Sequence, residues 1–224
     1  MPKIQDKLMQ IYEAMFQHFG PRGWWPGESR LEVIIGAILT QAVSWSNVVK
    51  AIDNMKSAGL IDIKAILAID EETLAGYIKP ALYNRQKAKK LKAIMKHIAG
   101  KYEADLDLMF RQPLKSLRTE LLAIWGIGPE TADSILLYAG DKSIFVIDTY
   151  TKRIFSRLGI VDEAITYQDM QDFMHFHLPK DTYLYNEFHA LLVGTGARYC
   201  RKKQPNCWEC PLQPYCVYFT QECR

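Results

Sequence analysis

Four cysteines near the C-terminal end of the chain constrain its fold more than any other feature. Their spacing is Cys200-x6-Cys207-x2-Cys210-x5-Cys216. Scattered core cysteines would not gather within seventeen residues, whereas zinc or an iron–sulfur cluster needs four converging thiolates. A secreted disulfide scaffold would spread its cysteines through the fold. The spacing therefore predicts a four-thiolate metal site, and Cys223 is expected to be a free thiol.

The composition is that of an ordinary folded protein. Of the 224 residues, 49% are hydrophobic, which is enough for one large domain or two compact lobes. The net charge of +3 adds little evidence for a nucleic-acid partner by itself. No apolar run approaches the roughly 18 residues that span a bilayer, and the N-terminus lacks a signal peptide's apolar stretch. We expect no membrane association and a cytoplasmic location, nucleoid-associated if the source is prokaryotic.

Hydrophobic spacing is helical over nearly the whole chain. Ser29 and Glu32 have the form of a capping box before an apolar helix. The only β-like run, 143–147, is too short and isolated to imply a sheet. The pattern therefore predicts an all-α protein of two lobes. The first expected helix begins at about Ile4 and is stopped by Gly20. The others are 31–40, 46–58, 84–99, 114–124, 130–138, 149–158, 167–176 and 181–198.

A Gly126-Ile127-Gly128 turn joins two of these helices. Such a turn lets the backbone approach another molecule closely, and amides that open the second helix favour an anion such as a DNA phosphate. An ordinary turn between helices would have the same sequence. The surrounding pattern favours a DNA contact, because apolar residues precede the turn, Thr131 follows it, and Asp148 lies further along the chain.

Together these motifs resemble the endonuclease III superfamily of DNA glycosylases, the helix-hairpin-helix-GPD proteins. The resemblance covers about residues 31–218. It implies a six-helix lobe over 30–142, with the hairpin at about 115–139, and a second lobe made of 1–29 and 143–224. It also implies a monomer that binds double-stranded DNA containing a damaged base.

The resemblance extends to the cysteine loop, 200–216. Many members of the superfamily end in a loop that binds a [4Fe–4S] cluster, and the cysteine spacing here is that of the family. Iron is therefore preferred over zinc, although both are four-thiolate sites. The implied cluster ligands are Cys200, Cys207, Cys210 and Cys216.

By the same resemblance, Asp148 is the catalytic carboxylate. Breaking an N-glycosidic bond builds positive charge on the sugar, and a preorganised carboxylate stabilises that charge and can orient or deprotonate the attacking water. Asp148 is also well placed to cap its helix, and the two roles are compatible. Members that cut the strand use a lysine eighteen positions earlier to form a Schiff base, but Glu130 stands there. This departure implies a monofunctional glycosylase without lyase activity, with Glu130 as a solvated first-turn acid.

The branch of the superfamily that removes 3-methyladenine implies a base pocket. Trp24, Trp25, Pro26 and Trp45 fall on the pocket positions of that branch, and Gln41 matches a glutamine that can fill the gap left by a flipped-out base. N3-alkylated adenine is positively charged, and tryptophan faces attract cations. The tryptophans would otherwise be core residues, and the glutamine a polar residue at a helix end.

Two alternatives stay open. The 3-methyladenine branch lacks the cysteine loop, whereas this chain keeps all four cysteines, so a mismatch thymine or uracil DNA glycosylase is the nearest competitor. The other alternative is a non-catalytic iron–sulfur protein that binds damaged DNA or senses redox state.

Two basic segments are candidates for contact with the DNA backbone. Arg201, Lys202 and Lys203 lie in the cysteine loop, which in the family meets the phosphates. A second run of basic residues crowds the helix at 85–96, where a charge run is usually a solvated face. Basic contacts of this kind give salt-dependent affinity without sequence preference.

Overall fold

The computed structural model describes residues 3–222 and divides the chain into two compact units. Unit 1 consists of Met1–Trp24 and Ser143–Arg224, and unit 2 consists of Trp25–Lys142. The first boundary therefore falls at Trp25 rather than at residue 30. Cys223 lies outside the described residues.

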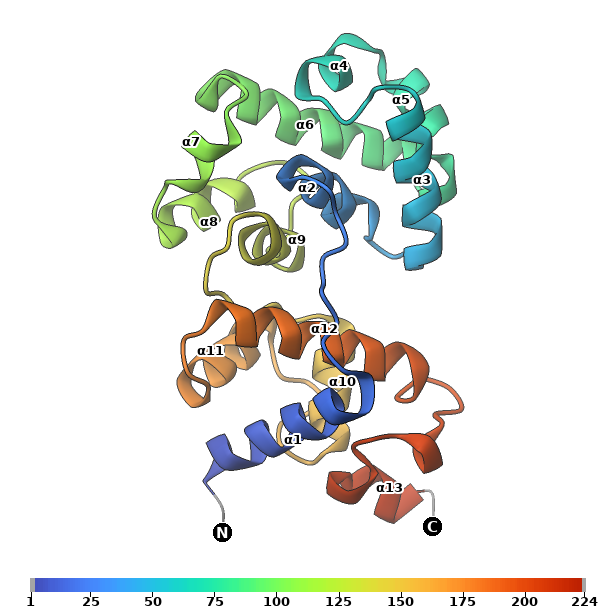
Figure 1. Cartoon of the computed structure of the whole chain (residues 1–224), viewed down its shortest axis with the longest axis vertical. Coiled ribbons are helices and arrows are strands. Elements are labelled where there is room, and N and C mark those ends of the chain that lie inside the picture. Colours follow the sequence, from blue (N-terminus) through green and yellow to red (C-terminus); the bar gives the residue numbers. More distant parts are fainter. Residues whose placement is uncertain (1–2, 223–224) are drawn as a thin grey trace. The chain divides into compact units, whose positions relative to one another are not determined.

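Helices make up both units, and residues 3–222 contain no strand, so the all-α prediction is confirmed. None of these helices combines the length and the apolar character needed to cross a membrane. Figure 1 labels the helices in chain order. Unit 2 holds α2 (Arg30–Leu39), α3 (Trp45–Ser57), α4 (Ile63–Ala68), α5 (Glu71–Tyr77), the 3-10 helix η1 (Lys79–Ala81), α6 (Asn84–Tyr102), α7 (Leu106–Phe110), α8 (Leu114–Leu122), α9 (Pro129–Ser134) and the π-helical turn η2 (Ile135–Ala139). Unit 1 holds α1 (Ile4–Phe19), α10 (Thr149–Arg157), α11 (Tyr167–His177), α12 (Thr182–Arg198), the 3-10 helices η3 (Cys207–Glu209) and η4 (Gln213–Tyr215), and α13 (Val217–Glu222).

The central helix of unit 2 is α2, which is buried on all sides from Leu31 to Leu39 and packs against α3, α6, α9 and η2. Its start is fixed by the predicted cap, because the Ser29 hydroxyl accepts a hydrogen bond from the Glu32 amide. The Glu32 carboxylate reaches back to the amide of Glu28 instead of that of Ser29. The helix therefore begins where the sequence indicated. Of the two bonds of the capping box, the one to the Glu32 carboxylate comes from the residue before the cap.

The central helix of unit 1 is α12, which packs against α10 and α1 (Figure 1). Its buried aromatic residue Phe188 contacts Phe145, Phe155 and Tyr12 edge-on or tilted. This packing fixes α10 against α12, and the arrangement positions the residues of the candidate site in unit 1.

Candidate active site

Asp148 caps the N-terminus of α10, as its sequence position indicated. Its backbone is extended, and Oδ1 accepts a hydrogen bond of 2.7 Å from the amide of Thr151. Only 9% of the residue is exposed. Capping satisfies one of the orphan amides of the helix and fixes the direction of the carboxylate.

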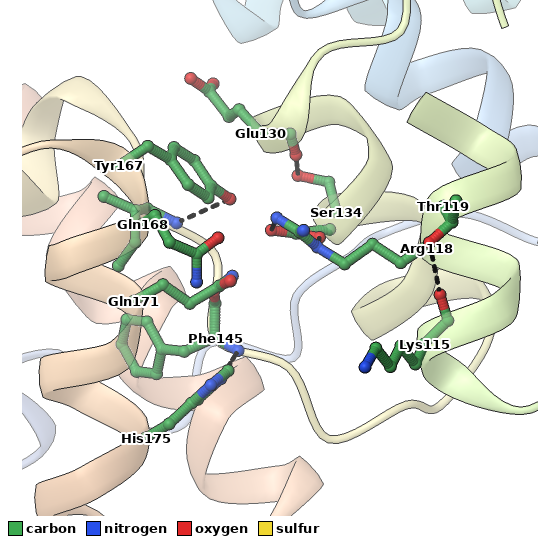
Figure 2. A network of polar contacts seen from close by, with 12 residues as sticks. Lys115, Arg118, Thr119, Glu130, Ser134, Phe145, Tyr167, Gln168, Gln171 and His175 are labelled. Carbon is green, nitrogen blue, oxygen red and sulfur yellow. Dashed lines mark hydrogen bonds and ion pairs between the residues drawn. The ribbon is translucent and has the colours of Figure 1, made fainter. Parts of the chain in front are cut away.

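The extended segment before Asp148 is held by side chains of α11 (Figure 2). The amide of Phe145 donates to Nε2 of His175 at 2.9 Å, and its carbonyl accepts from Nε2 of Gln171 at 2.7 Å. The amide of Ile147 donates to the hydroxyl of Tyr167 at 3.4 Å. Three backbone groups that a strand would pair with a neighbour are thus satisfied by side chains, which hold the segment that leads into the site.

The charge of Asp148 is stabilised against its burial. Burial is the largest single influence and would raise the pKa of this carboxyl. The imidazole of His189 and the amide of Thr151 act in the opposite direction and together hold the pKa below its usual value. Nε2 of His189, on α12, lies 3.7 Å from Oδ2 of Asp148. The site therefore presents an ionised carboxylate at neutral pH, the form that can stabilise a developing cation.

The hairpin in unit 2 follows the predicted pattern, with α8 and α9 joined by the Gly126-Ile127-Gly128 turn. Gly126 has a φ of +83°, a left-handed conformation that favours glycine. A Cβ there would lie 2.5 Å from Cγ of Lys90, because the stem of this lysine crosses the turn. Gly128 is extended and has open space around it.

Gln41 is bound to this hairpin. Its amide nitrogen donates to the hydroxyl of Thr131 at 2.8 Å and to the carbonyl of Gly126 at 3.3 Å, and its oxygen accepts a hydrogen bond from the ammonium of Lys90. Thr131 is buried, so its hydroxyl holds Gln41 rather than facing solvent. The end of α2, the basic helix α6 and the hairpin are thereby joined.

The second helix of the hairpin is anchored by a buried ion pair. Asp133 is fully buried, and Arg118 of α8 donates to its two oxygens from Nε at 2.7 Å and from a terminal nitrogen at 3.1 Å. Glu130 is exposed in the first turn of α9, and its carbonyl accepts from the hydroxyl of Ser134 (Figure 2). This fits the solvated, first-turn position expected for Glu130.

An aromatic cluster forms in unit 2 around Trp25. Its ring lies edge-on to Trp45 at 5.3 Å between centroids and tilted to Tyr138 at 5.5 Å, and all three rings are half-buried. Gly36 of α2 lies directly against the Trp25 indole, where a Cβ would be 3.0 Å from the ring. Pro26 is exposed beside the cluster, and Trp24 is the last residue of unit 1.

The four cysteines line one pocket in unit 1, together with Arg157 and several aromatic residues. Burial raises the pKa of the Cys210 thiol to about 11. Thiolates in such a place need a bound cation, and four of them match the ligands of a [4Fe–4S] cluster or zinc. No group of three or more His, Cys, Asp or Glu side chains within residues 3–222 is already arranged to hold a metal ion, so the match rests on the thiol donors and the pocket that they share.

Helix α10 is tied to this cysteine loop at its C-terminal end. Arg157 donates to Sγ of Cys200 at 3.3 Å and to the carbonyl of Arg201 at 2.9 Å, and Arg153 donates to the carbonyl of Cys200 at 2.8 Å. The side chains of Arg201, Lys202 and Lys203 are exposed. The loop thus presents cations to solvent while its backbone is bound to α10.

Three of the seven Lys and Arg side chains of the basic helix α6 point inward. Lys87 is 2% exposed and donates to the carbonyls of Leu39 and Ala81, and Lys92 donates to two carbonyls at the end of α4. Lys90 binds Gln41, as described above. Lys87 and Lys92 satisfy carbonyls at helix ends, while Arg85, Lys89, Lys96 and Lys101 are exposed.

Comparison with known proteins decides the family. Residues 35–177 match the model of the HhH-GPD superfamily of base excision DNA repair proteins. The chain belongs to this superfamily. The matched residues include the hairpin and Asp148 and end before the cysteine loop.

Individual members of the superfamily resemble the chain over nearly its full length. It is 43% identical over 219 residues to the "Putative DNA repair glycosylase MJ1434" of Methanocaldococcus jannaschii, covering 95% of this chain and 96% of that protein. The Helicobacter pylori 3-methyladenine DNA glycosylase MagIII, solved with 1,N6-ethenoadenine, is 27% identical with a TM-score of 0.72 over 85% of this chain and 94% of that one. An endonuclease III–DNA covalent intermediate has a TM-score of 0.85 at 20% identity over 100% of both chains, which shows the fold.

Several contacts of this HhH-GPD protein were not found from sequence. Tyr138 in the aromatic cluster, His189 beside Asp148 and Lys90 on Gln41 come from helix faces that sequence spacing does not orient. Arg153 and Arg157 had a usable signal, because they lie four residues apart on α10 and so on one helical face.

Proposed function

We propose that this protein is a monofunctional DNA glycosylase that hydrolyses the N-glycosidic bond of a flipped-out, alkylated purine such as 3-methyladenine. The observation that carries the proposal is Asp148: a buried carboxylate, ionised at neutral pH, fixed at a helix N-terminus by its own cap and preceded by a rigid backbone segment. A structural cap needs neither this burial nor an imidazole close to its second oxygen.

The chemistry follows from the carboxylate. As the bond to the base breaks, the sugar gains oxocarbenium character, and a fixed negative charge stabilises it without reorganisation. Asp148 also can orient or deprotonate the water that completes the hydrolysis. The product is an abasic site and a free base.

The absence of lyase activity rests on Glu130. A Schiff base needs an amine, and a carboxylate cannot form one. Glu130 occupies the position of the lyase lysine in the resemblance, so the abasic strand should be left uncut.

The aromatic cluster supports an alkylated purine as substrate. The faces of Trp25 and Trp45 can attract a cationic base by cation–π interaction, and Tyr138 adds a third ring. The likeness to MagIII, whose solved complex contains 1,N6-ethenoadenine, favours the same class of base. Trp24 and Pro26 are assigned to the pocket by resemblance. A mismatch thymine or uracil glycosylase, or a non-catalytic damage-binding protein, is the competing function.

The cysteine loop is proposed to hold a [4Fe–4S] cluster through Cys200, Cys207, Cys210 and Cys216. The shared pocket and the thiol donor set fit such a group, which would fix the loop at the end of α12. Metal analysis and visible absorption of the purified protein distinguish iron–sulfur from zinc, and a colourless zinc protein contradicts the assignment.

The proposed DNA contacts are the Gly126-Ile127-Gly128 turn and the exposed side chains of Arg201, Lys202 and Lys203. Thr131 contributes by holding Gln41 against the turn. These groups would bind phosphates irrespective of sequence.

Base release from defined duplexes tests the function. Methylated, G·T and uracil duplexes are incubated with the wild type, Asp148→Asn and Asp181→Asn, and free bases are identified by chromatography. Asparagine caps helices well, so Asp148→Asn should fold but release no base. Asp181→Asn makes the same change at the cap of α12, where Asp181 accepts from the amide of Leu184, and should keep its activity.

The outcomes separate the alternatives. Release of 3-methyladenine, no trapped adduct with borohydride and loss in Asp148→Asn alone support the proposal. Release of thymine or uracil instead refutes the substrate assignment, a trapped adduct refutes the monofunctional assignment, and tight DNA binding without any released base supports the non-catalytic alternative.

A further inference from the structure

The two oxygens of the Asp148 carboxylate have different partners. Oδ1 accepts the 2.7 Å hydrogen bond from the Thr151 amide, and Oδ2 lies 3.7 Å from Nε2 of His189. The second separation is too long for a hydrogen bond but lies within the roughly 4 Å range of an ion pair. Oδ1 therefore caps helix α10, and Oδ2 faces an imidazole, which is a group that can carry a positive charge.

His189 is held in place as firmly as Asp148. It is 5% exposed and lies on α12, the most buried helix of unit 1, directly after the core residue Phe188. Because α12 packs along α10, the imidazole cannot move away from the carboxylate without disturbing the core. The pair is therefore part of the rigid interior of unit 1.

Apart from Lys152, the other charged side chains of α10 and α12, and two titratable side chains of α11, have partners elsewhere. On α10, Arg153 and Arg157 bind the cysteine loop and Lys152 is half-buried. On α12, Glu187 accepts from the amides of Arg22 and Gly23, and Arg198 lies over the Tyr199 ring. On α11, His175 and Tyr167 bind the backbone before Asp148.

We propose that His189 is a positioning residue for the glycosylase reaction, which keeps the buried Asp148 carboxylate ionised and directed and thereby sets the acidic limit of base release. The inference rests on the proposed function of Asp148. A neutral helix cap and burial alone would leave the carboxyl liable to protonation, and a protonated carboxyl does not stabilise an oxocarbenium ion.

The sign of the effect follows from the two opposing influences on Asp148. Burial raises the pKa of its carboxyl, and His189 is the first of the groups that lower it. Replacing His189 by a neutral residue leaves burial opposed by the cap alone, so the pKa rises. The acidic limb of the rate profile must then move to higher pH.

The test is the pH profile of base release under single-turnover conditions for the wild type, His189→Gln and Thr195→Val. Thr195 is the matched control, because it is a fully buried polar residue of α12 whose hydroxyl has no hydrogen-bond partner within residues 3–222. We expect His189→Gln to lose more than about tenfold in rate near its new acidic limb and to approach the wild-type rate at higher pH. Thr195→Val should keep the wild-type profile.

If His189→Gln loses the same fraction of its rate at every pH, the role of His189 is merely structural and the proposal is overturned. A pH profile whose acidic limb does not move also overturns it. The pKa of the Asp148 carboxyl is measured in parallel by NMR of protein labelled with ¹³C at aspartate, with Asp148→Asn for assignment. If this pKa rises in His189→Gln although no base is released from any substrate, the effect of His189 on Asp148 is supported and the proposed function fails. If Asp148 is required for release but its pKa does not move, the pair fails and the function stands.

Discussion

Replacing Gly126 by alanine should destabilise the hairpin, and the magnitude can be worked out from two contacts. A residue with a Cβ at a φ of +83° carries backbone strain of about 1–2 kcal/mol. The new Cβ would also lie 2.5 Å from Cγ and 2.9 Å from Cδ of Lys90, so the lysine stem must move. That movement breaks the hydrogen bond from Lys90 to Gln41, and a bond from a charged donor is worth about 1.5–3 kcal/mol.

The expected loss is about 2.5–5 kcal/mol in the free energy of unfolding, which lowers Tm by about 2–4 °C for each kcal/mol in a chain of this size. Gly128→Ala is the control. Gly128 is extended, with a φ of −90° and no heavy atom within 4 Å of an added Cβ. This variant should stay within about 0.5 kcal/mol of the wild type.

The assay is urea unfolding followed by circular dichroism, with a double-mutant cycle against Lys90→Ala. If the lysine stem causes part of the loss, Gly126→Ala should cost less in the Lys90→Ala background, where only the backbone strain remains. Equal stability of Gly126→Ala and Gly128→Ala would refute the conformational argument. Equal losses of Gly126→Ala in both backgrounds would refute the role of Lys90.

Three other predictions concern charged groups. Burial lowers the pKa of Lys87 to about 8, below the value in the unfolded chain. The stability of the wild type relative to Lys87→Met should therefore rise between about pH 8 and 10, as measured by urea titrations. A difference in stability that does not change with pH contradicts this. Arg118→Met leaves the buried carboxylate of Asp133 without its guanidinium and should cost about 3–5 kcal/mol in unfolding free energy. The double variant Lys202→Ala/Lys203→Ala should reduce the slope of log affinity against log salt by about 2 in DNA titrations, and an unchanged slope removes both lysines from the interface.

The sequence predicted those features that depend on local chemistry. The turn at Gly126, the cap at Ser29 and the cap at Asp148 follow from residues within one helical turn of each other, and all three occur in the structure. The all-α class follows from the same local patterns repeated along the chain.

The features that could not be predicted depend on partners far apart in the chain. The run at 143–147 has the composition of a strand, but its backbone groups bind His175, Gln171 and Tyr167 of a helix that begins twenty residues later. In the same way, the number of cations on α6 can be read from the sequence, but the hydrogen bonds from Lys87 to two buried carbonyls cannot.

The electrostatics of Asp148 also bear on the choice of base. An N3-alkylated adenine carries a positive charge and leaves as a neutral molecule, so its departure needs little protonation by the protein. Thymine and uracil leave as anions, so a site for those bases must also supply a proton or hydrogen-bond donors to the leaving base. On the proposed function, an ionised carboxylate for the sugar and electron-rich rings for the base are sufficient for an alkylated purine and insufficient for a pyrimidine. The carboxylate, held in its charged form inside unit 1, is therefore the group on which the rate should depend most.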